Sequence, residues 1–239
     1  MLAPRRDGPH IGRMFKLTPI LLAVAYGLLL YRFSAWRTAR ELDQKSAELA
    51  DPALKSVTDR LARALDLPRI RVHLYEVGPV NGLAAPDGRI FLTRGFYDRF
   101  RAGAVTAEEL ASVIAHELGH VALGHTRRRM IDFSGQNAVR AVLMMTIGRL
   151  IPFAGAMLVN ALIGLVAARL SRSDEYEADA YATALLIKAG IGAGPQKSLF
   201  AKLEGLTGGR GDAPAWMMSH PPPAARIAAI EANEAKWLA

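Results

Sequence analysis

The amino-acid sequence predicts an α+β fold that is mostly helical, with a small β-hairpin sheet. Apolar residues recur at helical spacing over much of the second half of the chain, and alternation typical of strands occurs between residues 70 and 92. Two long apolar segments, residues 17–36 and 138–170, indicate contact with a membrane. A length of 239 residues suffices for one domain with appended segments.

The N-terminal region predicts a tail followed by an anchor. Residues 1–16 are basic and rich in proline and glycine, which favours a disordered tail. Residues 17–36 begin with 15 residues that carry no charge, and Arg32 can extend its side chain toward the interface. The segment is therefore expected to be a single transmembrane helix. The alternative is a signal peptide that is cleaved near residues 23–25.

The region from residue 37 to residue 92 contains the predicted sheet. Residues 38–66 are typical of helix, with a break or a new helix start at Asp51-Pro52. Apolar and polar residues alternate from Ile70 to Tyr75, which predicts a strand. Residues 86–88, Pro-Asp-Gly, are typical of a hairpin turn and join two short strands.

The next helix carries the motif with the clearest chemical meaning. Thr106, followed by two acidic residues, is typical of a helix N-terminus, and no proline interrupts residues 107–125. His116, Glu117 and His120 form the pattern H-E-x-x-H within this helix. Residues four apart lie on one helix face, so both imidazoles can bind one Zn²⁺. The glutamate can then take a proton from a water that the metal activates.

A catalytic zinc needs a third protein ligand, and the sequence offers two places for it. His125 lies nine residues after His116, so on the same helix it would point away, as expected of a surface or helix-end histidine. Glu175 and Asp179 share a face of a later helical segment that starts near Ser171. One carboxylate could bind zinc while the other orients a ligand imidazole. The alternative is an acidic first turn on an ordinary surface helix.

The apolar segment 138–170 lies between the H-E-x-x-H motif and Glu175, and this position limits how often the segment can cross a membrane. One membrane crossing would separate His116 from Glu175, and two crossings need about 40 residues and a turn. We therefore expect a membrane-interface insert that is a helix pair broken near Pro152. A buried pair of core helices is the alternative.

Composition excludes several classes of function. The formal net charge is +8, but no nucleic-acid motif accompanies it, so we expect no nucleic-acid partner. The run Arg127-Arg128-Arg129 is suited to anionic lipid headgroups, or otherwise to a solvated helix end. The chain has no cysteine, which excludes disulfides, thiolate metal ligands and a cysteine nucleophile.

Four sequence blocks resemble the membrane-associated zinc peptidases that include HtpX, the CAAX prenyl endopeptidases and the Oma-type proteins. The blocks lie between residues 51 and 239 and comprise residues 81–92, 109–125, 171–179 and 219–227. The resemblance implies a zincin-like metallopeptidase domain, which we place at residues 37–239. Gly82 departs from the family pattern, where alanine is more usual, and is expected to loosen its strand slightly without touching the chemistry.

The resemblance also implies a role for each residue of the site. It implies that His116, His120 and Glu175 bind one Zn²⁺ per subunit and that Glu117 is the general base. It further implies that Asp179 supports the metal ligands. The histidine that matches His220 approaches the active site in some relatives, where it stabilises the oxyanion or caps the zinc.

The predicted function is that of a membrane-anchored, zinc-dependent endopeptidase acting in membrane or envelope protein quality control. The expected partners are a protein or peptide substrate and membrane lipids, and the expected location is the bacterial inner membrane or an equivalent. An edge strand from Ala84 to Leu92 is expected to bind the extended substrate. Lysine and arginine are balanced around the anchor, so the membrane side of the site is not predicted. The alternative is a non-hydrolytic zinc chaperone or assembly factor.

Overall fold

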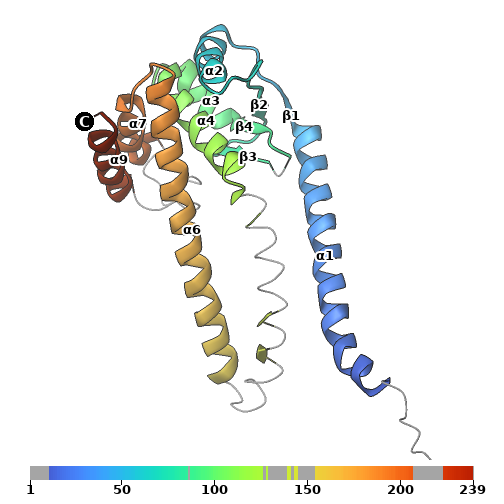
Figure 1. Cartoon of the computed structure of the whole chain (residues 1–239). Helices are drawn as coiled ribbons and strands as arrows, with labels where there is room; N and C mark the ends of the chain where they lie inside the picture. The colour runs from blue at the N-terminus through green and yellow to red at the C-terminus, as the bar shows by residue number, and fades with distance from the viewer. Residues whose placement is uncertain are drawn as a thin grey trace, which may run out of the picture. The chain divides into compact units, whose positions relative to one another are not determined.

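The structure is a computed structural model that describes residues 11–85, 87–125, 128, 139–140, 143–144, 154–206 and 223–238. The chain divides into two units, one comprising Met1–Arg37 with Arg129–Gly164 and the other Thr38–Arg128 with Leu165–Ala239. The second unit contains a small sheet and several helices (Figure 1), so the mostly helical α+β prediction is confirmed.

The sheet of the second unit has four strands in the order β1-β2-β4-β3. β1 (Ser46–Glu48) is antiparallel to β2 (Val72–Tyr75), and β2 is parallel to β4 (Ile90–Thr93). β4 also pairs antiparallel with β3 (Gly82–Ala84), which confirms the predicted hairpin. The predicted edge from Ala84 to Leu92 needs correction, because β4 is an inner strand and, of the two hairpin strands, only β3 lies at an edge of the sheet.

Residues 38–66 do not form helix throughout. α1 (Ile11–Lys45) ends before β1, and α2 (Pro52–Ala64) begins after it, so β1 was missed by the helical prediction. The predicted break at Asp51-Pro52 is confirmed. The carboxylate of Asp51 accepts hydrogen bonds from the backbone of α2 and stabilises its first turn.

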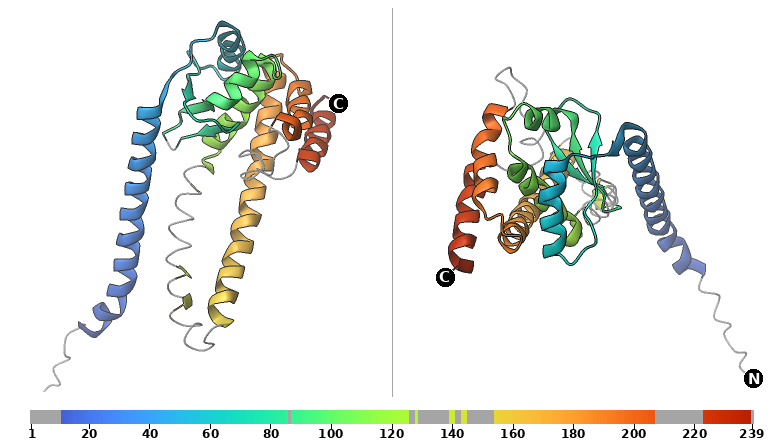
Figure 2. Two further views of the ribbon diagram at one scale, coloured as in Figure 1. Left: turned by 180° about the vertical axis from the view of Figure 1, so that it is seen from behind. Right: turned by 90° about the horizontal axis from the view of Figure 1, so that it is seen from above.

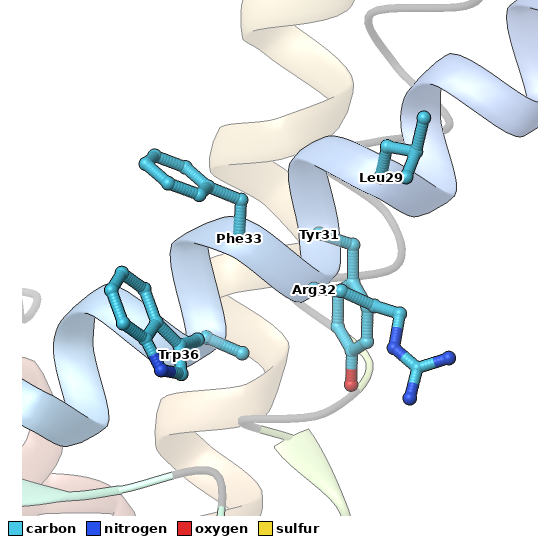
Figure 3. A pocket seen from close by; sticks show the side chains of 6 residues that line it. Leu29, Tyr31, Arg32, Phe33 and Trp36 are labelled. Atoms are coloured by element: carbon cyan, nitrogen blue, oxygen red, sulfur yellow. The ribbon is translucent and has the colours of Figure 1, made fainter.

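α1 is helical over all of the predicted anchor. It begins at Ile11, so residues 11–16 are helical, although we expected a disordered tail there. Its side chains are described from residue 25 onward, and large apolar ones such as Phe33 and Trp36 are exposed. Figure 3 shows side chains that line a pocket along this stretch, which is formed by Leu29, Tyr31, Arg32, Phe33, Ala35 and Trp36.

The core of the second unit forms around α4 (Ala107–Ala122), which contacts α2, β3 and β4. α3 (Arg94–Arg101) leads from the sheet to α4, and α4 also packs on α7 (Gly194–Leu206). α9 (Pro223–Leu238) lies against α7 in turn, and Figure 2 shows both helices on the side of α4 away from the strands. The motif helix is therefore covered by structure along most of its length.

α6 (Ala154–Lys188) is one continuous helix of 35 residues. We expected a new helix to start near Ser171, but no glycine or proline between residues 165 and 188 interrupts the helical hydrogen bonds. The second half of the predicted insert 138–170 therefore belongs to the helix that carries Glu175. Pro152 and most of residues 138–153 lie outside the described residues.

Candidate active site

α4 begins with a reciprocal cap and places the motif in its buried part. The Thr106 hydroxyl accepts from the Glu109 backbone, and the Glu109 carboxylate accepts from the Thr106 backbone. The side chains of His116, Glu117 and His120 are all buried. The prediction that the motif lies within a helix and is held by a core is confirmed.

Gly119 brings α4 close to α6. A Cβ atom at Gly119 would lie 3.1 Å from both the Cα and the carbonyl oxygen of Ala178. Only glycine fits there without displacing the neighbouring backbone. This close crossing sets Glu175, about one turn before Ala178, and Asp179, the residue after it, opposite the two histidines.

Three side chains converge on one point between α4 and α6. The two Nε2 atoms of His116 and His120 are 3.1 Å apart, and they lie 3.3 and 3.4 Å from the carboxylate oxygens of Glu175. Donors about 2.0–2.1 Å from a tetrahedral zinc lie roughly 3.3–3.4 Å from one another. The two imidazoles and the carboxylate therefore fit a zinc ion both in chemistry and in spacing, and they form the group of described residues that could hold a metal.

Asp179 supports His116 from the side opposite Glu175. Asp179 Oδ1 lies 2.9 Å from His116 Nδ1. Arg226, in α9, donates from Nη2 to Oδ1 and from Nε to Oδ2 of Asp179, at 2.6 Å each. The Arg226 side chain is fully buried, and its guanidinium lies 4.3 Å from the centre of the Phe200 ring.

Arg226 is a site residue for which the sequence suggested no role. It belongs to the fourth block of the family resemblance, but nothing in the local pattern indicates which side chain it contacts. Its position depends on α9 packing against α7, which is a tertiary contact. The signal that could have revealed it is a lone arginine among the apolar residues 223–230 at the start of α9.

The electrostatics of the pocket favour a charged His116 when no metal is bound. Burial disfavours the imidazolium, but hydrogen bonds with Asp179 and Glu175 outweigh it and raise the pKa of His116 to about 9. At neutral pH, the metal-free protein therefore holds a proton where the metal would bind. Metal binding has to displace that proton.

Glu117 lies beside the edge strand β3. A Cβ atom at Gly82 would lie 3.7 Å from Glu117 Oε1 and 2.5 Å from Val113 Cγ1. The missing side chain lets β3 approach the motif helix closely, while the expected loosening of the strand stays a prediction. The general-base candidate and the sheet edge are neighbours as a result.

Two further predicted residues have different outcomes. His125 does not point away from the motif: its buried ring contacts His120, because α4 has already ended and Gly124 turns the chain with φ +70°. His220 lies outside the described residues, so its role is still a prediction.

Two histidines and a glutamate that fit one metal, with a second glutamate beside a sheet edge, form an arrangement typical of metallopeptidases. Residues 48–234 match the model of peptidase family M48, and the chain belongs to this family. The predicted resemblance is thereby confirmed.

Proteins named as metalloproteases or proteases are similar to this chain. Metalloprotease LoiP of Escherichia coli K12 is 32% identical over 157 residues, which cover 66% of this chain and 60% of LoiP. Metalloprotease YcaL of the same strain is 30% identical over 169 residues, covering 71% of this chain and 64% of YcaL. A protease HtpX homolog of Salinibacter ruber is 29% identical over 180 residues, covering 68% and 62%. The chain thus spans less than two thirds of the length of each relative.

Proposed function

We propose that this protein is a zinc-dependent endopeptidase in which His116, His120 and Glu175 bind the metal. The observation that carries the proposal is the spacing of 3.1 to 3.4 Å among their donor atoms at a buried point. Zinc bound there supplies Lewis-acid polarisation of the scissile carbonyl and lowers the pKa of a water toward about 7.

The chain's own groups then divide the work of hydrolysis. Glu117 takes the proton of the attacking water and passes it to the leaving amine. Its carboxylate is suited to this role because Glu117 adjoins the metal ligand His116 on the same helix. Asp179 accepts from the Nδ1–H of His116 and keeps Nε2 free for the metal. Arg226 keeps Asp179 ionised and in place through its two hydrogen bonds.

We further propose that β3 binds the substrate as an added strand. β3 is an edge strand, so one side of its backbone can pair with an extended peptide. Its residue Gly82 adjoins Glu117, which brings a bound backbone next to the proton acceptor. Recognition through backbone hydrogen bonds tolerates many sequences, and this suits an enzyme of protein quality control.

We infer that the protein works at a membrane, with α1 as its anchor and the apolar half of α6 as a further contact with lipid. Among residues with described side chains, one helix, Gly155–Lys188, is long and apolar enough to cross a membrane by length and composition. Its apolar half exposes large side chains such as Met157, Leu158 and Leu165. Contact with lipid would remove these side chains from water.

The test combines metal analysis with digestion by the purified full-length protein. Wild type is expected to contain one zinc per chain and to degrade casein, and a chelator is expected to stop the reaction reversibly. Glu117→Gln should retain zinc and lose proteolysis, because the amide cannot accept the proton. A Glu117→Gln protein that still performs the full cellular function would favour the alternative of a zinc chaperone. Cleavage that resists chelation would refute the proposed mechanism.

A further inference from the structure

We propose that His125 is a positioning residue that orients the imidazole of His120 for metal binding. The proposal rests on the zinc site proposed above. Three features carry it: the turn that returns His125 to the site, the contacts of its two ring nitrogens, and the proton arrangement that these contacts require.

The turn depends on Gly124. α4 ends at Ala122, and Gly124 takes a left-handed conformation with φ +70°, which a residue with a side chain adopts only with strain. The chain therefore changes direction before His125 instead of continuing the helix. The imidazole of His125 returns to the last turn of α4 and is fully buried there.

Both ring nitrogens of His125 have partners. Its Nδ1 lies 3.0 Å from Nδ1 of His120, and the two rings meet edge to face at 67°. Its Nε2 lies 3.2 Å from Oε2 of Glu177 and 3.9 Å from Oδ1 of Asp174, both on α6. Asp174 in turn accepts a hydrogen bond from Arg128. His125 thus connects a proposed metal ligand on α4 to carboxylates on α6.

The proton arrangement follows from the metal. His120 binds through Nε2, which faces His116 and Glu175, so its proton is on Nδ1. That N–H donates to Nδ1 of His125, which is therefore the acceptor. The proton of His125 is then on Nε2, where it donates to Glu177. A neutral imidazole in one tautomer thus fixes the ring of His120.

The two histidine ligands are therefore held in different ways. His116 donates directly to Asp179, a buried carboxylate that Arg226 also binds. His120 donates to a neutral ring, and the chain of hydrogen bonds ends at Glu177, whose side chain is 50% exposed. Outer partners of this kind commonly account for 10–100-fold in metal affinity.

The experiment measures zinc affinity by competition with a chromophoric chelator, using the full-length protein. His125→Leu removes the acceptor but keeps a buried side chain, and it is expected to weaken zinc binding by about 10–100-fold. His73→Leu is the matched control, because His73 lies on β2 against Phe91 and does not contact the site. Its zinc affinity should equal that of wild type. Equal affinity of His125→Leu and wild type would overturn the proposal.

A second pair of variants separates positioning from simple packing, and it keeps the test valid if the leucine variant does not fold. His125→Asn places an amide oxygen near the Nδ1 position and can still accept from His120. His125→Gln places its amide near the Nε2 position and reaches Glu177 instead. Both are polar and of similar size, so packing predicts equal affinities, whereas positioning predicts tighter zinc binding by the asparagine variant. Equal affinities would contradict the proposal.

Wild type separates this inference from the proposed function. If wild type itself binds no zinc, the proposed function fails. If wild type binds zinc and all the His125 variants bind it equally well, only the role of His125 fails.

Discussion

The two halves of α6 place opposite kinds of side chain in contact with solvent. In its C-terminal half, Glu175 and Asp179 are 0% and 1% exposed, although both are acidic. In its N-terminal half, Met157 and Leu165 are 77% and 69% exposed, although both are apolar. The helix is continuous, so the backbone does not explain the difference.

The comparison shows that partners determine burial on this helix. A buried carboxylate is costly unless hydrogen bonds, a cation or a metal compensate it, and Asp179 has Arg226 and His116. An exposed apolar face is equally unusual and marks contact with another apolar phase. We therefore interpret the N-terminal half of α6 as lipid-facing and the C-terminal half as metal-binding. Each interpretation can be tested separately.

The largest effect is expected at the metal ligand of the buried half. Glu175→Ala removes a charged donor, so zinc affinity should fall by more than the roughly 100-fold that loss of an outer partner costs. Proteolysis at limiting zinc should fall with it. Competition titration measures the affinity. A variant that binds zinc as tightly as wild type would show that Glu175 is not a ligand.

The next effect is expected on the stability of the fold, from the cation that holds Asp179. Arg226→Met leaves a buried carboxylate without its guanidinium partner, which typically costs about 3–5 kcal/mol of unfolding free energy. Urea denaturation of the metal-free protein measures this loss.

The matched control for Arg226 is Lys197→Met, which breaks the partly exposed Lys197–Glu234 ion pair. Its cost should stay below about 1 kcal/mol. If the two variants are equally stable, the buried pair does not hold α9 to the site.

The stability of the metal-free protein should depend on pH through His116. Its pKa is about 9 in the folded state, above its ordinary value of 6.5, so the folded state binds the proton more tightly. The resulting stabilisation is full below about pH 6.5 and is lost as pH rises through 9. The loss is on the order of 3 kcal/mol between these limits.

Chemical denaturation at several pH values measures this dependence, and His116→Gln should abolish it. Saturating zinc should also remove the decline, because the metal takes the place of the proton. If the unfolding free energy of the metal-free protein rose between pH 6.5 and 9, the predicted direction of the pH dependence would be wrong.

The smallest effect is expected on the apolar half. Leu158 and Leu165 are 58% and 69% exposed, so transfer to lipid gains about 1 kcal/mol for each, roughly half of full burial. The double variant Leu158→Gln, Leu165→Gln should therefore bind vesicles about 30-fold more weakly, since 1.4 kcal/mol corresponds to tenfold. Its zinc affinity should not change. Unchanged vesicle flotation would leave α1 as the sole membrane contact among the described residues.

Predictions that rested on local geometry were confirmed. The motif lies within α4 because capping at Thr106 and uninterrupted apolar spacing depend on neighbours in sequence. The hairpin formed because the turn residues and the short flanking strands are also local. The strand β1 was missed, because residues 46–48 carry no strand pattern and pair only when β2 is present.

Predictions of helix ends were wrong at two places, the end of α4 and the start of α6. His125 was expected to point away from His116 because a continuous α4 was assumed, and Gly124 breaks that continuity. Ser171 was expected to start a helix, but its backbone was already within α6. Both errors concern where a helix ends, which a periodic pattern determines weakly.

The sequence by itself determined that two imidazoles and a glutamate share one region of a helix, since residues four apart are neighbours by helix geometry. It also indicated that Glu175 and Asp179 belong together on another helix. Only the tertiary structure decided that Glu175 faces both Nε2 atoms while Asp179 faces Nδ1 of His116. The physical reason is that the close crossing at Gly119 sets the rotation of α6 against α4, and no local pattern encodes that rotation.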